Sequence, residues 1–109
     1  MEPVYLDNAS TTRLAPDVFE AMKLYLTDEY ANASSIHAMG QKAKTALEDS
    51  RAKIAKYLGA QPSEIIFTSG GTESNNHALK GVLWGSNKKH LITTRIEHDS
   101  IMRSAAWLE

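Results

Sequence analysis

The sequence predicts an α/β protein in which an N-terminal arm and two helices precede a strand–helix–strand unit. Apolar residues recur at three- and four-residue spacing over residues 16–27 and again over 36–58, as they do along one side of a helix. Two short runs rich in β-branched residues, 64–68 and 90–94, then flank another stretch of helical spacing. Strand, helix, strand and helix in that order predict a parallel βαβ unit with a right-handed crossover.

Composition restricts the class of protein. The 109 residues correspond to one small domain or a piece of a larger one, and 42% hydrophobic with 23% charged residues is typical of a soluble globular chain. Because the net charge is -1 and no apolar run is long enough for a span, we expect neither nucleic acid nor a membrane as partner. The first residues lack the blocks of a signal peptide, so we expect a cytoplasmic protein. The absence of cysteine excludes a thiol nucleophile from these residues.

The first part of the chain contains an arm and the start of two helices. Residues 4–12 are expected to be an extended arm, since their Asp, Asn, Ser and Thr side chains compete for backbone hydrogen bonds. Pro16 and Asp17 suit the first turn of the first helix, where a missing N–H costs little and a carboxylate meets the positive end of the dipole. Ser34 or Ser35 is expected to be the N-cap of the second helix.

The second helical pattern, residues 36–58, is amphipathic, with apolar residues on one side and charged residues on the other. Gly59 follows its last apolar position and is expected to close the helix as the C-terminal cap residue. The pattern changes just beyond this point. We therefore divide the chain into an arm and helical segment, residues 1–62, and an α/β segment, residues 63–109.

The turn at residues 69–76, Ser-Gly-Gly-Thr-Glu-Ser-Asn-Asn, carries the clearest chemical signal. A strand that ends in two glycines and enters a helix leaves free backbone N–H groups at the positive end of that helix, which suits a phosphate. Gly70 and Gly71 allow close approach of the backbone, and Thr72 adds a hydroxyl donor. From the local pattern alone, the simpler interpretation is a tight turn with Ser69 or Thr72 as helix cap. The turn is neither a P-loop nor a G-x-G-x-x-G motif.

Four blocks of sequence together resemble the cysteine desulfurases of the class V aminotransferase group. Residues 67–76 are similar to their F-T-S-G-x-T-E-x-x-N motif, and residues 5–12, Tyr-Leu-Asp-Asn-Ala-Ser-Thr-Thr, resemble their opening Y-L-D-N-A-A-T-T. Residues 32–37 resemble N-P-S-S-x-H, and residues 97–98 resemble the Glu-His that precedes the next helix. The blocks occur in the family's order and span nearly the whole chain.

The resemblance implies roles for particular residues. Gly71 and Thr72 would hold the phosphate of pyridoxal 5'-phosphate, and His98 would lie against its pyridine ring and serve in proton transfer. The family's substrate entrance corresponds to Asn8, Ala9 and Thr11. No metal site is implied.

Two histidines also have simpler interpretations. By sequence alone, His98 at the start of a helix is a surface or capping residue, and His37, although it matches a family position, is equally well a buried or capping histidine. The sequence departs from the family's Gly-Asn-Pro-Ser-Ser at Ala31 and Ala33, which frees the backbone of this connector.

The resemblance also implies a fold and an activity. The fold would be the first βαβ unit of the large domain of a PLP-dependent, fold-type I transferase, and the chain would be the N-terminal part of a cysteine desulfurase. Such enzymes convert L-cysteine to L-alanine and pass the sulfur on as a persulfide to an acceptor or scaffold protein, for iron–sulfur clusters or tRNA thiolation. They act as homodimers.

The family also needs a lysine that binds the cofactor covalently, an aspartate at the pyridine nitrogen and a nucleophilic cysteine. None is found here in the family's context, so we expect the 109 residues alone to be inactive. Two alternatives stay open. One is another class V enzyme, such as a selenocysteine lyase or an aminotransferase, and the other is a non-catalytic interaction or regulatory fragment of the same fold.

Overall fold

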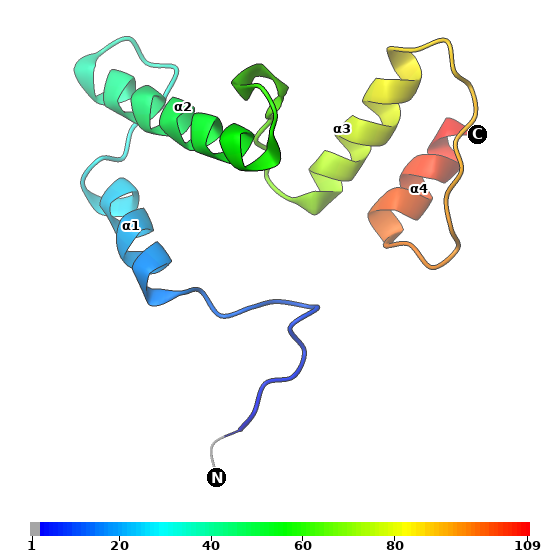
Figure 1. The fold of residues 1–109 in the computed structure, drawn as a ribbon, viewed down its shortest axis with the longest axis horizontal. Helices are drawn as coiled ribbons and strands as arrows, with labels where there is room; N and C mark the ends of the chain where they lie inside the picture. Colours follow the sequence, from blue (N-terminus) through cyan, green and yellow to red (C-terminus); the bar gives the residue numbers. More distant parts are fainter. Residues whose placement is uncertain (1–2) are drawn as a thin grey trace. The chain divides into compact units, whose positions relative to one another are not determined.

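The computed structural model describes residues 3–109, which contain four α-helices and one short 3₁₀ helix (Figure 1). The chain divides into two compact units, with the division after Ile65. The first unit contains α1 (Pro16–Thr27), α2 (Ala38–Leu58) and η1 (Pro62–Glu64), and the second contains α3 (Gly71–Trp84) and α4 (Asp99–Leu108).

The first predicted helix is confirmed as α1. Pro16 lies at its first position, where the missing N–H has no partner to lose, and Asp17 lies in its first turn. The helix ends where the Thr27 hydroxyl donates to the carbonyl of Lys23 at 2.9 Å. Local signals in the sequence therefore mark the start of this helix.

The second predicted helix is confirmed as α2, but its predicted N-cap is wrong. The N-cap is His37, whose Nδ1 accepts a hydrogen bond from the Gly40 N–H at 3.3 Å. Both serines lie in the turn before the helix. The Ser34 N–H donates to the Asn32 side chain at 2.8 Å, and the Ser35 carbonyl accepts from the Gln41 side chain. The loop keeps both serines outside the helix.

Two glycines determine how α2 begins and ends. Gly40 is buried, and a Cβ placed there would lie 2.6 Å from the Ser35 Cβ and 2.9 Å from the Asn32 carbonyl oxygen, so no side chain fits. Gly59 is the C-cap with φ 66°, a left-handed conformation that favours glycine, which confirms the predicted cap.

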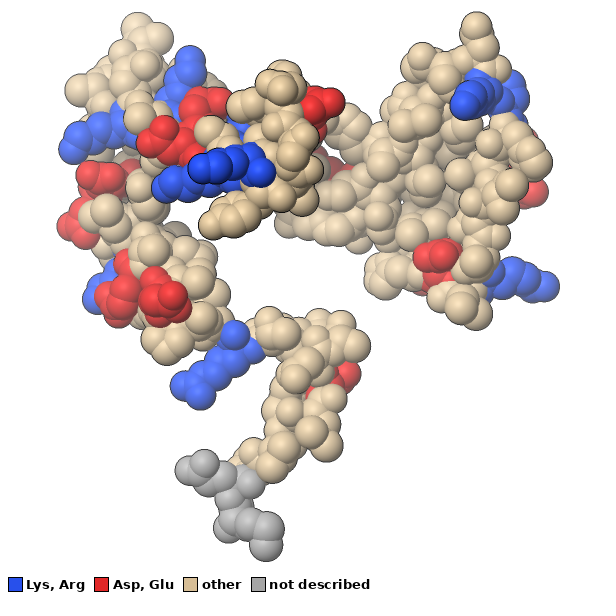
Figure 2. Space-filling view, in the orientation of Figure 1, with Lys and Arg blue, Asp and Glu red and all other residues tan. Residues whose placement is uncertain are grey.

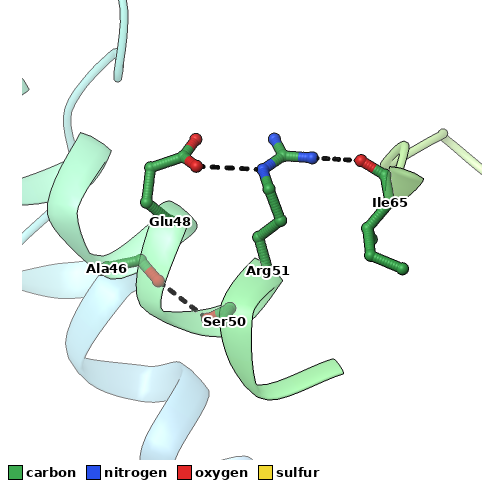
Figure 3. A network of polar contacts seen from close by, with 5 residues as sticks. All are labelled: Ala46, Glu48, Ser50, Arg51 and Ile65. Carbon is green, nitrogen blue, oxygen red and sulfur yellow. Dashed lines mark hydrogen bonds and ion pairs between the residues drawn. The ribbon is translucent and has the colours of Figure 1, made fainter. Parts of the chain in front are cut away.

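Arg51 of α2 holds the chain that follows η1 (Figure 3). Its Nε donates to the Glu48 carboxylate at 3.1 Å, and its Nη1 donates to the Ile65 carbonyl. A charge-assisted donor therefore satisfies a backbone acceptor in an extended segment that has no strand partner. This contact fixes where the chain leaves the first unit.

In the second unit, α3 and α4 lie side by side with their N-terminal ends together (Figure 1). Near those ends, the Asn75 side chain donates to the Ser100 hydroxyl at 2.9 Å. At the opposite ends, the rings of Trp84 and Trp107 meet edge to face with centroids 5.7 Å apart, and Lys80 lies over Trp107. The two helices are therefore parallel and are held at both ends.

The predicted strands are not formed within residues 3–109, so the predicted βαβ unit is not found there. Residues 65–68 and 88–94, which cover most of the two predicted strands, contain no strand. Their β-branched composition favours extended backbone, yet a strand also needs a neighbour to complete its hydrogen-bond ladder. Ile66 is 62% exposed and Ile92 is 84% exposed, so neither segment is packed as a sheet strand would be.

Little apolar surface is buried in either unit. Ala55 is the buried hydrophobic residue of the described part of the chain, whereas large apolar side chains such as Trp84 and Trp107 are more than half exposed. Figure 2 shows charges of both signs gathered over α2, while the charged side chains visible on the α3–α4 unit lie toward its edges. The middle of this face of the second unit thus presents apolar and neutral polar surface.

Candidate functional site

The start of α3 leaves backbone donors free. Gly70 is the N-cap residue, in an extended conformation, and the first backbone bond of the helix runs from the Ser74 N–H to the Gly70 carbonyl at 3.1 Å. Within residues 3–109, the N–H groups of Gly71, Thr72 and Glu73 have no hydrogen-bond partner. These groups and the helix dipole form a positive end that attracts an anion.

Glu73 of the first turn is turned toward Ser69. Its Oε2 accepts from the Ser69 hydroxyl at 2.6 Å and from the Ser69 N–H at 2.8 Å. The hydroxyl bond, then the backbone bond, lowers the pKa of the Glu73 carboxyl below its ordinary value of 4.5, with a smaller contribution from the charge of His77. The Ser69 amide is therefore already satisfied, and the amides left for a ligand are those that begin at Gly71.

The other side-chain hydrogen bonds of this turn do not involve the Thr72 hydroxyl. The Thr68 and Ser74 hydroxyls lie 2.6 Å apart, and the Asn76 side chain donates to the Thr72 carbonyl at 2.9 Å. No partner of the Thr72 hydroxyl is found in the described part of the chain. A Cβ built at Gly71 would meet no atom within 4 Å, so the space beside these donors is open. Free amides, a free hydroxyl and open space fit a phosphate.

His98 is the N-cap of α4 and is exposed to solvent. Its Nδ1 accepts from the Ser100 N–H at 3.1 Å and lies 2.9 Å from the Ser100 hydroxyl. Because a backbone N–H can only donate, Nδ1 must be the unprotonated nitrogen, and the ring proton of neutral His98 is on Nε2. The capping interpretation of this histidine is thus correct, and it leaves Nε2 free for a ligand.

The second unit brings His98 to the same end as the predicted phosphate turn. Asn75 lies three residues beyond Thr72, or about 4.5 Å along the helix axis, and it contacts Ser100 at the start of α4. The positive ends of two helices are therefore adjacent, with an imidazole beside them. Sequence reasoning missed Asn75 and Ser100, because a contact across 25 residues has no local pattern.

The predicted substrate-entrance residues Asn8, Ala9 and Thr11 belong to the first unit and are exposed. They form a turn in which the Asp7 carbonyl accepts from the N–H groups of Ser10 at 3.1 Å and Thr11 at 3.4 Å. Gly71, Thr72 and His98 belong to the second unit, whereas Asn8, Ala9 and Thr11 belong to the first.

His37, for which the sequence left two interpretations, is a helix cap. No helix of residues 3–109 combines the length and the apolar character that a membrane span requires. The same residues hold no cluster of three or more side chains suited to a metal ion.

Comparison with known proteins identifies the family. Residues 4–109 match the aminotransferase class-V family. The chain is 51% identical over 108 residues to the cysteine desulfurase IscS of Dictyoglomus turgidum, covering 97% of this chain and 27% of that protein. It is 48% identical over 110 residues to the mitochondrial cysteine desulfurase of Drosophila melanogaster, covering 98% of this chain and 24% of that protein.

A solved structure supports the same family. A NifS-like protein matches with a TM-score of 0.84 and 42% sequence identity over 93% of this chain and 28% of that protein. The chain therefore belongs to the aminotransferase class-V family, whose members depend on pyridoxal 5'-phosphate, and its fold is a part of that PLP-enzyme fold. It spans about a quarter of the length of the relatives it matches.

Proposed function

We propose that these residues supply the phosphate-holding part of a PLP-dependent cysteine desulfurase. The observation that carries the proposal is the set of free donors at the start of α3, adjacent to the His98 cap of α4, in a chain whose relatives are named cysteine desulfurases. Gly71 and Thr72 would hold the phosphate through their N–H groups and the Thr72 hydroxyl. When bound, pyridoxal 5'-phosphate supplies an electron sink for charge that develops on the amino acid.

The other residues of this chain have supporting roles in the proposal. His98 would lie against the pyridine ring and serve in proton transfer as a donor at Nε2, since Nδ1 accepts from the Ser100 N–H. Asn8, Ala9 and Thr11 would line the substrate entrance. Residues 63–109 would begin the cofactor-binding large domain, and residues 1–62 would precede it as arm and helical segment.

The proposed reaction converts L-cysteine to L-alanine while a thiol of the enzyme takes the sulfur as a persulfide. That thiol cannot come from these 109 residues, which contain no cysteine. We therefore propose that this chain alone is inactive, and that the active enzyme is a cytoplasmic homodimer that passes sulfur to an acceptor or scaffold protein for iron–sulfur clusters or tRNA thiolation.

A chimera tests the proposal. The 109 residues replace the matching 108-residue region of the Dictyoglomus turgidum relative, and sulfide release from L-cysteine is measured with cofactor absorbance as a second readout. We expect an active chimera, loss of cofactor affinity on Thr72→Val, and loss of turnover with retained cofactor on His98→Ala. Ser50→Ala in α2 is the matched control, because its hydroxyl donates only to the Ala46 carbonyl (Figure 3).

Two results would contradict the proposal. One is a folded chimera whose affinity for the cofactor is unchanged by Thr72→Val. The other is sulfide release by the 109 residues alone when they are given pyridoxal 5'-phosphate and L-cysteine, which would show that they need no further residues.

A further inference from the structure

A buried serine connects the two helices of the second unit to His98. Ser100 is 8% exposed, and its hydroxyl lies 2.9 Å from the Asn75 amide nitrogen and 2.9 Å from His98 Nδ1. The Asn75 side chain is half-buried, while the His98 ring is exposed. A half-buried amide and a buried hydroxyl are thus linked in series to one ring nitrogen of an exposed histidine.

The direction of these bonds follows from the donors. The Ser100 N–H donates to Nδ1, so Nδ1 is an acceptor. The Asn75 amide donates to the Ser100 oxygen, which leaves the Ser100 hydroxyl proton free to point at Nδ1 as a second donor. Asn75, Ser100 and His98 therefore form one relay whose bonds all point toward Nδ1.

The relay is more than a helix cap requires. His37 caps α2 with its own Nδ1, which accepts a single backbone N–H from Gly40 at 3.3 Å. Capping is thus achieved elsewhere in this chain without a serine hydroxyl or an asparagine. The additional donor at His98 acts on the ring itself, because it favours the form in which Nδ1 is unprotonated.

We propose that Ser100 and Asn75 are positioning residues that hold His98 in its Nε2–H form and fix the orientation of its ring. Nε2 then presents an N–H hydrogen-bond donor to whatever lies against it. Proton abstraction at Nε2 would need the proton on Nδ1, where the Ser100 N–H already points. That Nε2–H donates to a bound cofactor or substrate rests on the proposed function. The tautomer and the orientation of the His98 ring do not.

The test is a long-range ¹H–¹⁵N correlation spectrum of the histidine side chains in the 109-residue chain, recorded where imidazole is neutral. We expect His98 to show the Nε2–H pattern. Asn75→Asp, whose carboxylate draws the Ser100 hydroxyl away, and Ser100→Ala should each lower the tautomer ratio about fivefold, which corresponds to the ~1 kcal/mol of one hydrogen bond. The His37 signals should not change.

Ser104→Ala is the matched control, since this buried hydroxyl of α4 donates to the Ser100 carbonyl and not to the ring. Backbone amide signals of α4 report whether each variant keeps the helix. If Ser100→Ala loses the helix, Asn75→Asp still tests the inference. An Nδ1–H pattern in the unmodified chain, or an unchanged ratio in a variant that keeps α4, would overturn the inference. Loss of cofactor binding in the chimera, in contrast, would count against the proposed function alone.

Discussion

At the scale of single residues, Glu73 decides which donors of the α3 turn a ligand can reach. Its carboxylate accepts both the hydroxyl and the N–H of Ser69, so it is bound within the turn. A free carboxylate in the first turn would compete with a phosphate for the same amides. The Ser69 contact therefore makes an acidic first turn compatible with an anion site.

The Glu73 carboxyl gives a prediction that is measurable by ¹³C NMR titration of the side chain. Because its pKa is lowered, the Ser69 contact stabilises the turn above the ordinary value of 4.5, and the contribution is lost as pH falls through the lowered pKa. Ser69→Ala should raise the Glu73 pKa toward 4.5, since the hydroxyl is the largest cause. Ser74→Ala, whose hydroxyl pairs with Thr68, should leave it in place. Equal effects of the two changes would contradict this account.

At the scale of elements, the junction between the 28–36 connector and α2 depends on a glycine. Gly40→Ala would force a Cβ against the Ser35 side chain and the Asn32 carbonyl, which we expect to lower the free energy of unfolding by about 1–3 kcal/mol. Gly81→Ala in α3 is the matched control, because the nearest atom to its Cβ is a His77 carbon at 3.5 Å.

Both variants are measured by urea denaturation followed by circular dichroism. At Gly81, alanine should be neutral or stabilising by up to about 1 kcal/mol, as expected for a helix-interior glycine replaced by alanine. If Gly40→Ala were as well tolerated as Gly81→Ala, the close approach of the connector to α2 would be wrong.

Sequence predicted these elements unevenly, for physical reasons. Pro16, Asp17 and Gly59 carry local signals, so α1 and the end of α2 were predictable. The strands were not, because pairing needs a neighbour that extended segments such as 88–94 do not find within the described residues. His98 was ambiguous between a cap and a ligand because its environment depends on a side chain 25 residues before Ser100.

At the scale of the whole molecule, the proposed reaction needs more than the second unit offers. That unit has two adjacent helix N-termini and an imidazole, but these 109 residues contain no cysteine whose thiol could take the sulfur in the proposed reaction. The exposed apolar side chains of α3 and α4, including Trp84 and Trp107, provide a surface that gains stability when further protein covers it. The chain spans about a quarter of the length of its relatives, so most of a protein of that length would be available to cover this surface.

The central claim is that the start of α3 holds the phosphate of the cofactor. It is tested most directly by following backbone amide signals of the 109-residue chain during titration with pyridoxamine 5'-phosphate, and with pyridoxamine, which lacks the phosphate. The account predicts saturable shifts of the Gly71 and Thr72 amides with the phosphate compound alone, weakened by Thr72→Val. Equal responses to both compounds, or shifts confined to other parts of the chain, would contradict it.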